Sequence, residues 1–227
     1  MATWRDTTGK VTGLVVREMT ESFNEMWYLA DENDLVARFE FFRKSKKKNL
    51  FITNSPYFKK RFLYHSLLKS LSGAKKFIHL TTPYFIPDRK LLRILKNAAK
   101  RGVEVKVVLP ETIDVPTVAS ASHSSFDELL KAGIKIFKYK PFVLHAKTVI
   151  VDGEWGTYGS FNLDSLSFRY NYEANIVTDD HHTLLELEKD FQSDLSHSRE
   201  ILLSEWRKRP FIRKVQEFFV APIRGFL

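Results

Sequence analysis

The sequence predicts an α/β fold in which helices cover both faces of a mixed β-sheet. From residue 49 onward, short apolar runs alternate with segments whose apolar residues recur at helical spacing. Gly102 and Gly133 each stand between a helical segment and the apolar run that follows it, as is typical of helix C-termini. An Asp-Gly pair at residues 152–153 separates two strand-like runs, as in a hairpin. Strands and helices that alternate in this way favour a layered α/β domain.

The expected elements follow one another along the chain. We expect strands at residues 49–53, 76–82, 103–109, 134–139, 143–151, 155–161 and 172–178, with a strand or loop at 11–16. We expect helices at residues 17–30, 58–71, 88–101, 124–132, 183–195 and 199–207, and an amphipathic helix at 210–221. Residues 83–87 and 110–118 are expected loops, and residues 35–42 fit either a strand or a helix.

Composition limits the classes of protein to which the chain can belong. Its 227 residues suffice for one domain, or one and a fragment, and 44% hydrophobic residues can build a core. The formal net charge of +9 favours anionic partners, either phospholipid headgroups or nucleic acid. The absence of cysteine excludes disulfides and thiolate metal sites, and it fits a reducing compartment. No apolar run is long enough to span a membrane, and the N-terminus lacks the apolar core of a signal peptide.

The predicted hairpin concentrates side chains that suit phosphate chemistry. Because side chains on a strand alternate between faces, His145, Lys147 and Val149 share one face. Ser160 and Asn162 share a face on the returning strand. The hairpin therefore predicts one attacking or proton-carrying group, one fixed positive charge and two neutral donors at a single place. The alternative is an ordinary buried hairpin, which explains none of the other spacings and buries an unpaired lysine.

The spacing H-x-K-x-x-x-x-D, followed after six residues by G-S-x-N, resembles the HKD motif of the phospholipase D superfamily. The residues that carry it are His145, Lys147, Asp152, Gly159, Ser160 and Asn162. Segments at residues 81–88, 98–105, 129–137, 144–148 and 206–210 resemble the second half of bacterial cardiolipin synthases. Residues 3–30 resemble the closing part of the first half of the same enzymes.

The resemblance implies two in-line steps at phosphorus, with no metal and no cofactor. One histidine attacks phosphorus and forms a phosphohistidine, while another protonates the leaving alcohol and later deprotonates the incoming one. Lys147 and Asn162 are implied to hold the non-bridging oxygens, so that a fixed positive charge replaces a metal ion. The family pairs each histidine with a carboxylate from the opposite half, and Glu173 is the candidate partner for the other half's histidine. We expect Asp152 to serve the turn and its local hydrogen bonds rather than to move protons.

Ligands of layered sheets bind near strand ends. The loops at residues 83–87 and 110–118 are therefore either pocket walls or simple connecting turns. Pro83, Tyr84 and Phe85, together with Gly159 of the motif, are the candidate substrate contacts.

The chain contains one H-x-K sequence, whereas the enzymes it resembles carry an HKD motif in each half. We therefore expect the C-terminal part of a two-motif enzyme. Its second motif would come from a second copy in a homodimer or from a separate first-half chain. Residues 1–48 are expected to be a remnant of the preceding half with its linker, residues 49–209 the catalytic half, and residues 210–227 a basic amphipathic tail.

The implied function is transfer of a phosphatidyl group from a phosphatidylglycerol-like lipid, by a cytoplasmic protein bound peripherally to the inner face of a bacterial membrane. The tail is either an in-plane membrane helix or a helix docked on the domain. The basic run at residues 43–48 is either a solvated loop or a contact with an anionic surface.

Two other functions stay open. One is a single-motif phosphodiesterase or nuclease, although the Phe-rich tail makes nucleic acid the less favoured partner. The other is an inactive half-domain that binds anionic lipid or a partner subunit.

Overall fold

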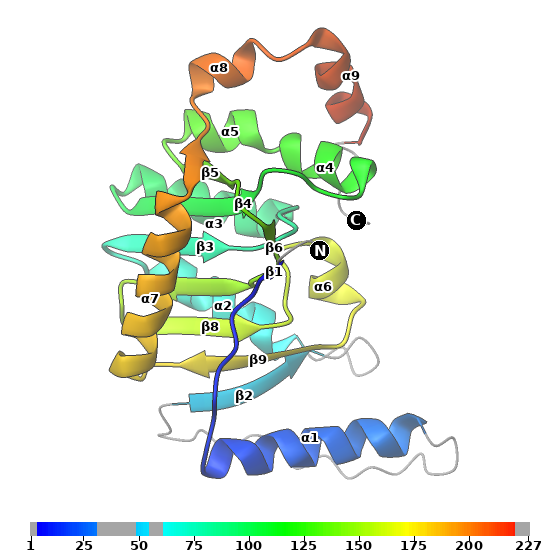
Figure 1. Ribbon diagram of the computed structural model, residues 1–227, viewed down its shortest axis with the longest axis vertical. Helices are drawn as coiled ribbons and strands as arrows, with labels where there is room; N and C mark the ends of the chain where they lie inside the picture. The colour runs from blue at the N-terminus through cyan, green and yellow to red at the C-terminus, as the bar shows by residue number, and fades with distance from the viewer. Residues whose placement is uncertain (1–3, 31–48, 55–60, 221–227) are drawn as a thin grey trace.

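The computed structural model describes residues 4–30, 49–54 and 61–220, and a mixed eight-stranded sheet forms its centre (Figure 1). The strands of this sheet are β2 (Asn49–Asn54), β3 (Phe77–Thr81), β4 (Glu104–Pro110), β5 (Lys135–Tyr139), β7 (Thr148–Val151), β8 (Trp155–Gly159), β9 (Glu173–Thr178) and β10 (Ser198–Glu200). Their order across the sheet is β10-β5-β4-β3-β7-β8-β9-β2. The neighbours β3, β4 and β5 are parallel, and every other pair is antiparallel. A second, two-stranded parallel sheet joins β1 (Trp4–Arg5) to β6 (Val143–Leu144).

Helices cover both faces of the large sheet, as the sequence predicts. The helices are α1 (Leu14–Ala30), α2 (Phe62–Gly73), α3 (Arg89–Lys100), α4 (Pro116–His123), α5 (Phe126–Lys131), α6 (Ser165–Arg169), α7 (His181–Ser196), α8 (Leu203–Arg207) and α9 (Phe211–Val220). In the view of Figure 1, α2 and α3 lie behind the sheet and α7 crosses its front. The α/β layered fold class is therefore confirmed.

Two hydrophobic cores fix the strand that carries the motif. The core behind the sheet combines α2 and α3 with alternate strand residues, among them Val149 of β7. The core in front packs Leu187 and Phe191 of α7 against residues that include Ile150 of β7. Because β7 is packed from both sides, the residues just before it, including Lys147, have a fixed starting position.

Four local predictions differ from the structure. The region expected as a strand or loop at 11–16 instead contains the start of α1 at Leu14. The loop expected at 110–118 ends in a helix, because Pro116 begins α4 at the position where proline is tolerated. The single strand expected at 143–151 is interrupted, since β6 ends at Leu144 and β7 begins at Thr148.

The fourth difference concerns the helix expected at 199–207. Its first residues instead form β10, which pairs antiparallel with the edge of β5, and the helix is the short α8. This pairing joins residues about 60 positions apart, so no local pattern announces it. Residues 35–42 and the basic run at 43–48 lie outside the described part of the chain.

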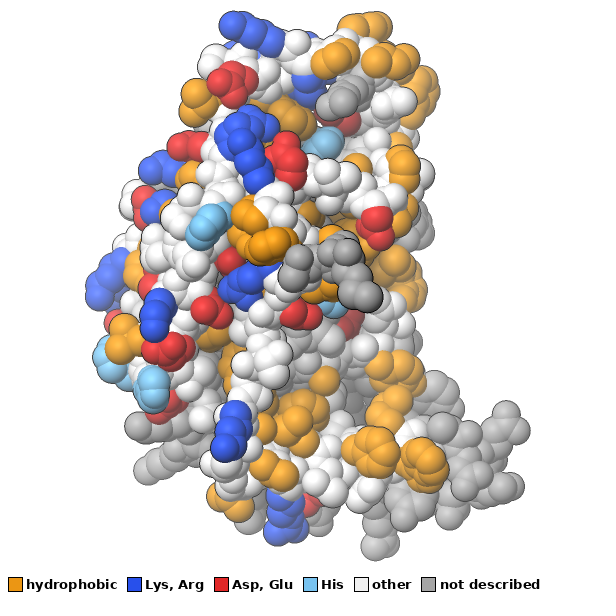
Figure 2. Space-filling model, viewed as in Figure 1, with side chains coloured by type: hydrophobic (Ala, Val, Ile, Leu, Met, Phe, Trp, Pro, Cys, Tyr) orange, Lys and Arg blue, Asp and Glu red, His pale blue; other side chains and the backbone are white. Residues whose placement is uncertain are grey.

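The predicted amphipathic tail forms α9, whose apolar side chains face solvent. The four most prominent are Phe211, Ile212, Phe218 and Phe219, each 63–78% exposed. Hydrophobic side chains gather over α9 at the upper right of Figure 2. The side that packs on the protein includes the partly buried Val215 and Val220 and the buried Glu217, which accepts hydrogen bonds from Arg209 at 2.6 and 3.0 Å. In the described residues no helix combines the length and apolar character needed to cross a membrane.

Asp152 lies in the turn between β7 and β8, at the far end of β7 from Lys147. Its backbone is left-handed, with φ of 58°. Its carboxylate accepts hydrogen bonds from the backbone N–H groups of Lys75 and Lys76 at 2.8 Å and of Phe77 at 2.9 Å. Burial raises the pKa of Asp152, but these three donors outweigh burial and hold it below its usual value. The geometry agrees with the structural role expected for Asp152, since its carboxylate ties the turn to the start of β3.

We predict that Asp152→Ala lowers the free energy of unfolding by about 2–4 kcal/mol, because three donors lose their acceptor and alanine disfavours positive φ. Asp152→Asn should cost less, since asparagine tolerates this backbone and keeps one acceptor. Urea unfolding at pH 7 measures both, with Glu154→Ala in the same turn as the exposed control. Equal stability of Asp152→Ala and Glu154→Ala would contradict this role.

Candidate active site

The N-terminal segment holds the backbone of the motif. In the parallel pairing of β1 with β6, Arg5 lies opposite Leu144. The Arg5 carbonyl then accepts hydrogen bonds from two successive N–H groups, His145 at 2.8 Å and Ala146 at 3.1 Å. The start of β7 lies beside the carboxyl end of β3, where Thr148 pairs with Thr81. The motif therefore lies at the strand edge where layered α/β sheets bind ligands.

His145 is held between a carboxylate and an ammonium. Its Nδ1 lies 2.9 Å from Oδ2 of Asp6, and its Nε2 lies 3.1 Å from Nζ of Lys147. A carboxylate can only accept and an ammonium can only donate, so the two partners favour a proton on Nδ1 and a lone pair on Nε2. The Trp4 ring lies edge-on to the imidazole, with centroids 4.9 Å apart. The predicted placement of His145 and Lys147 on one side is confirmed.

Lys147 is the fixed positive charge of the site. It is 8% exposed, and its Nζ also donates to the carbonyl of His145 at 2.6 Å. Burial lowers the pKa of Lys147, while the charges of Asp6, Glu173 and Asp164 oppose that shift. The three carboxylates therefore surround the ammonium closely enough to influence its charge.

Ser160 and Glu173 form a hydrogen-bonded pair on the other side of the site. The Ser160 hydroxyl donates to Glu173 at 2.5 Å and accepts from the N–H of Ala174 at 2.9 Å. Glu173, buried at the start of β9, also accepts from the Ser167 hydroxyl at 2.7 Å. The Ser160 proton, expected to serve a phosphate, is thus engaged by Glu173 in this structure.

Asn162 and Gly159 complete the motif for different physical reasons. The side-chain oxygen of Asn162 is buried and has no hydrogen-bond partner within the described residues, which leaves this acceptor open to a donor group. Gly159 lies against β9, where an added Cβ would come within 2.3 Å of the Ala174 carbonyl. The glycine is therefore needed for close approach of two strands.

The three candidate substrate contacts in the loop at residues 83–87 differ in burial. Phe85 is fully buried and Pro83 is buried, so both support the loop from within. For Phe85 the prediction of a substrate contact is corrected, because its ring fills the core behind the sheet. Tyr84 is partly exposed, and its hydroxyl donates to Asp114 at 3.0 Å. This bond joins the two loops that the sequence suggested as pocket walls.

The comparison with known families agrees with this geometry. A family model described as "Cardiolipin synthase, PLD-like domain" matches residues 67–195, more than half of the chain. The chain belongs to the PLD-like domain family of cardiolipin synthase. The predicted resemblance to the phospholipase D superfamily is thereby confirmed. No metal-ligand cluster of three or more His, Cys, Asp or Glu is found within the described residues.

Relatives and solved structures that match the PLD-like chain differ in length from it. It is 31% identical over 226 residues to "Cardiolipin synthase" of Clostridium perfringens, which covers 96% of this chain and 48% of that protein. The chain thus spans about half the length of the curated relatives it matches. Nuc from Salmonella typhimurium, a phospholipase D family member, superposes with a TM-score of 0.58 at 22% identity, over 68% of this chain and 99% of Nuc. Phosphatidylserine synthase of Haemophilus influenzae gives 0.65 at 14% identity, over 97% of this chain and 56% of that one. At these identities the two structures support the PLD-like fold alone.

Two carboxylates of the PLD-like site were not predicted. Asp6 is the only acidic residue among residues 1–17, in the segment that resembles the closing part of a first half. The family pairs each histidine with a carboxylate of the opposite half. This pairing, combined with the single acidic residue in residues 1–17, is a signal that could have identified Asp6. Asp164 caps α6 by accepting a hydrogen bond from the N–H of Ser167 at 2.7 Å. Burial, with the charge of Glu173, raises the pKa of Asp164 to about 6.

The raised pKa of Asp164 predicts a pH-dependent stability. The folded-state pKa of Asp164 is about 6, above the ordinary aspartate value of 3.8. Between these two pH values the folded state holds a proton that the unfolded state releases. The favourable contribution of this proton to folding stability is complete below the unfolded-state pKa of Asp164. It is lost as the pH rises through about 6. Asparagine avoids this loss, since it cannot ionise and its oxygen still accepts from Ser167.

We predict that the stability of Asp164→Asn relative to the natural protein rises by up to about 3 kcal/mol between about pH 4 and pH 7. Urea unfolding of both proteins across this range measures the difference. A difference that stays constant with pH would contradict the shifted carboxyl.

Proposed function

We propose that this chain supplies one half of the active site of a phosphatidyltransferase of cardiolipin synthase type. The observation that carries the proposal is the imidazole of His145, whose Nδ1 faces Asp6 while its Nε2 faces Lys147. An Nε2 lone pair is the group that attack on phosphorus needs. Family membership supports the reaction class, and an anionic phospholipid such as phosphatidylglycerol is the proposed donor.

The proposed first step is attack of His145 Nε2 on phosphorus. The Nε2–P bond forms as the bond to the leaving alkoxide breaks, and a second imidazole gives that alkoxide a proton. Positive charge develops on the imidazole of His145, where Asp6 stabilises it across the Nδ1 hydrogen bond. Lys147 moves its ammonium from Nε2 to a non-bridging oxygen, and Asn162 donates to the same phosphoryl group.

The second step reverses the first with a different alcohol. The second imidazole removes the proton of the acceptor hydroxyl, whose oxygen attacks the phosphohistidine. The N–P bond breaks and its electron pair returns to Nε2 of His145. Atoms and charge balance over the two steps, because the electron pair returns to Nε2 and the second imidazole regains its proton. Lys147 stays cationic throughout.

A second copy or a first-half chain is proposed to bring the second imidazole. Three observations support this. The chain spans about half of its relatives, the site has one histidine, and apolar side chains stand exposed beside it. Four side chains within three residues of Arg5, His145 or Glu173 in the chain are 42–61% exposed: Trp4, Phe142, Val143 and Tyr172. Glu173 is the proposed carboxylate partner of the incoming imidazole.

The proposed site of action is the inner face of a bacterial membrane, with α9 as the peripheral contact. Exposed Phe218 and Phe219 lie on a helix preceded by exposed Arg207 and Lys208, a combination that favours anionic lipid surfaces. This chemistry supports an in-plane helix rather than a helix packed by its apolar face on the protein.

We predict that Phe218→Asp with Phe219→Asp weakens co-sedimentation with phosphatidylglycerol vesicles by about tenfold or more, since burial of two aromatic rings is lost. Leu185→Asp on α7 is the matched control, because Leu185 is also an exposed apolar residue on a helix. Equal binding of all three proteins would rule out α9 as the contact.

We predict that His145→Ala lowers transfer between phosphatidylglycerol molecules by about a thousandfold or more and abolishes the covalent phosphatidyl adduct. Cardiolipin formed in vesicles and the intact protein mass measure the two effects. His65→Ala, an exposed histidine on α2, should behave like the natural protein. Full transfer by His145→Ala would contradict the mechanism.

The same assay separates the two other functions that the sequence leaves open. Cleavage of DNA without lipid turnover, weakened steeply by salt, would indicate the single-motif nuclease that the net charge of +9 also suits. Vesicle binding without an adduct, with or without added first-half chain, would indicate the inactive lipid-binding half-domain.

A further inference from the structure

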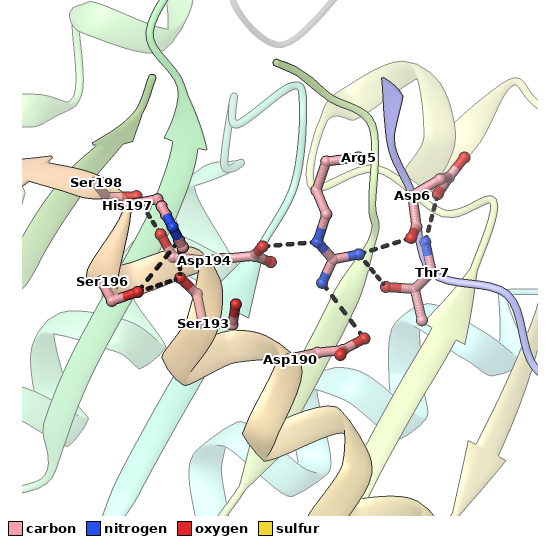
Figure 3. Close-up of polar contacts among 9 residues, drawn as sticks. All are labelled: Arg5, Asp6, Thr7, Asp190, Ser193, Asp194, Ser196, His197 and Ser198. Atoms are coloured by element: carbon pink, nitrogen blue, oxygen red, sulfur yellow. Dashed lines mark hydrogen bonds and ion pairs between the residues drawn. The ribbon is translucent and has the colours of Figure 1, made fainter. Parts of the chain in front are cut away.

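The guanidinium of Arg5 connects the N-terminal segment to α7 (Figure 3). Its Nε lies 2.6 Å from Oδ1 of Asp194, and its Nη2 lies 3.4 Å from Oδ2 of Asp190. Its Nη1 donates in the opposite direction, to the carbonyl of Asp6 at 2.6 Å and to the hydroxyl of Thr7 at 3.2 Å. One side chain thus ties α7 to the segment that carries the partner of His145.

The connection between Arg5 and Asp194 is strong, because the buried Asp194 carboxylate requires a positively charged partner. It is 3% exposed and lies in the last turn of α7, where the helix dipole disfavours a negative charge. Burial raises the pKa of the Asp194 carboxyl, and Arg5 opposes that shift by hydrogen bonding and charge. Burial lowers the pKa of Arg5, but Asp194 outweighs it and the net direction is upward. Separation of the pair would leave a carboxylate buried and unpaired.

The contacts pass from Arg5 to His145 along two routes. The backbone route is direct, since the Arg5 carbonyl accepts from the N–H groups of His145 and Ala146. The side-chain route runs through Thr7, whose N–H donates to Oδ1 of Asp6 at 2.9 Å. With Oδ1 occupied, Oδ2 of Asp6 is the oxygen that meets Nδ1 of His145. The orientation of the imidazole therefore depends on the position of residues 5–7.

Backbone pairing alone holds this segment weakly. The β1–β6 pairing extends over two residues on each strand, which is short for a stable ladder. Farther along, Gly9 lies against the ring of Tyr158, where an added Cβ would come within 2.5 Å. In addition to these two contacts, the Arg5 guanidinium supplies charged contacts to α7.

We propose that Arg5 is a positioning residue, which anchors the N-terminal segment to Asp194 so that Asp6 orients His145. The catalytic consequence rests on the proposed phosphatidyl transfer, whereas the structural consequence does not. Arg5 contacts neither Nε2 nor the expected phosphate position, so it acts through Asp6 and through the backbone of His145.

Amide hydrogen exchange tests the structural consequence without any turnover. Arg5→Met keeps a long apolar side chain and removes every donor. It should lower the protection of the His145 and Ala146 amides by about tenfold or more, because their shared acceptor becomes mobile. The amide of Ile150 in β7 should keep its protection. Arg17→Met is the matched control, since it breaks an exposed pair with Glu21 on α1.

Unchanged protection of His145 and Ala146 in Arg5→Met would overturn the proposal. If Arg5→Met also opens Ile150, Arg5→Lys decides, because lysine keeps a charge for Asp194. Retained protection of His145 and Ala146 in Arg5→Lys supports the proposal. Loss of protection at these two amides in an Arg5→Lys protein that keeps Ile150 protected contradicts it.

Kinetics test whether Arg5 acts through Asp6. Arg5→Met should lower kcat by about 10- to 100-fold with KM little changed, the effect of a misplaced catalytic group. In an Asp6→Asn background the same substitution should add little, since the contact it positions is already lost. Additive effects would contradict action through Asp6. A natural chain without turnover would count against the proposed transfer and leave the exchange result to decide the role of Arg5.

Discussion

The hydrogen bond between Asp6 and His145 is the interaction on which the rest of the site depends. It joins residues 139 positions apart and sets which nitrogen of the imidazole is available for chemistry. Lys147, which directly precedes a strand packed on both faces, meets the other nitrogen. The fold contributes two rigid supports, β7 for Lys147 and α7 for the segment of Asp6, and the imidazole is oriented where they meet.

The charges of the site support the proposal that a partner half completes it. Lys147 is surrounded by Asp6, Glu173 and Asp164, so the described half carries more carboxylates than cations around its phosphate position. A phosphodiester anion would be repelled by such a set unless more positive charge arrives. A second imidazole and ammonium, in the proposed partner half, would supply it. The raised pKa of Asp164, about 6, reduces the excess by favouring its neutral form.

The sequence predicted well what depends on local spacing. The hairpin and the structural role of Asp152 follow from alternation and turn chemistry over a few residues. His145 and Lys147 do lie together, although they stand between β6 and β7 and not within one strand. The layered fold follows from the alternation of strands and helices. The amphipathic α9 follows from its helical period, although its exposure required the structure, because a period does not say what covers the apolar face.

What the sequence missed depends on contacts between distant segments. The pairing of β10 with β5 and the burial of Phe85 arise from tertiary packing, and both were predicted otherwise. The role of Asp6 required two facts to be combined, the family's cross-half pairing and a single acidic residue in the N-terminal segment. Arg5 carried no sequence pattern at all, since its importance comes from the buried Asp194 that faces it.

The tautomer of His145 is the most direct test of the orienting role of Asp6. Nitrogen-15 spectra of the histidine-labelled chain at about pH 9, where imidazoles are neutral, report which ring nitrogen bears the proton. We predict a proton on Nδ1 and none on Nε2 in the natural protein, with the preference lost in Asp6→Ala. A proton on Nε2 in the natural protein, or identical spectra for the two proteins, would contradict it.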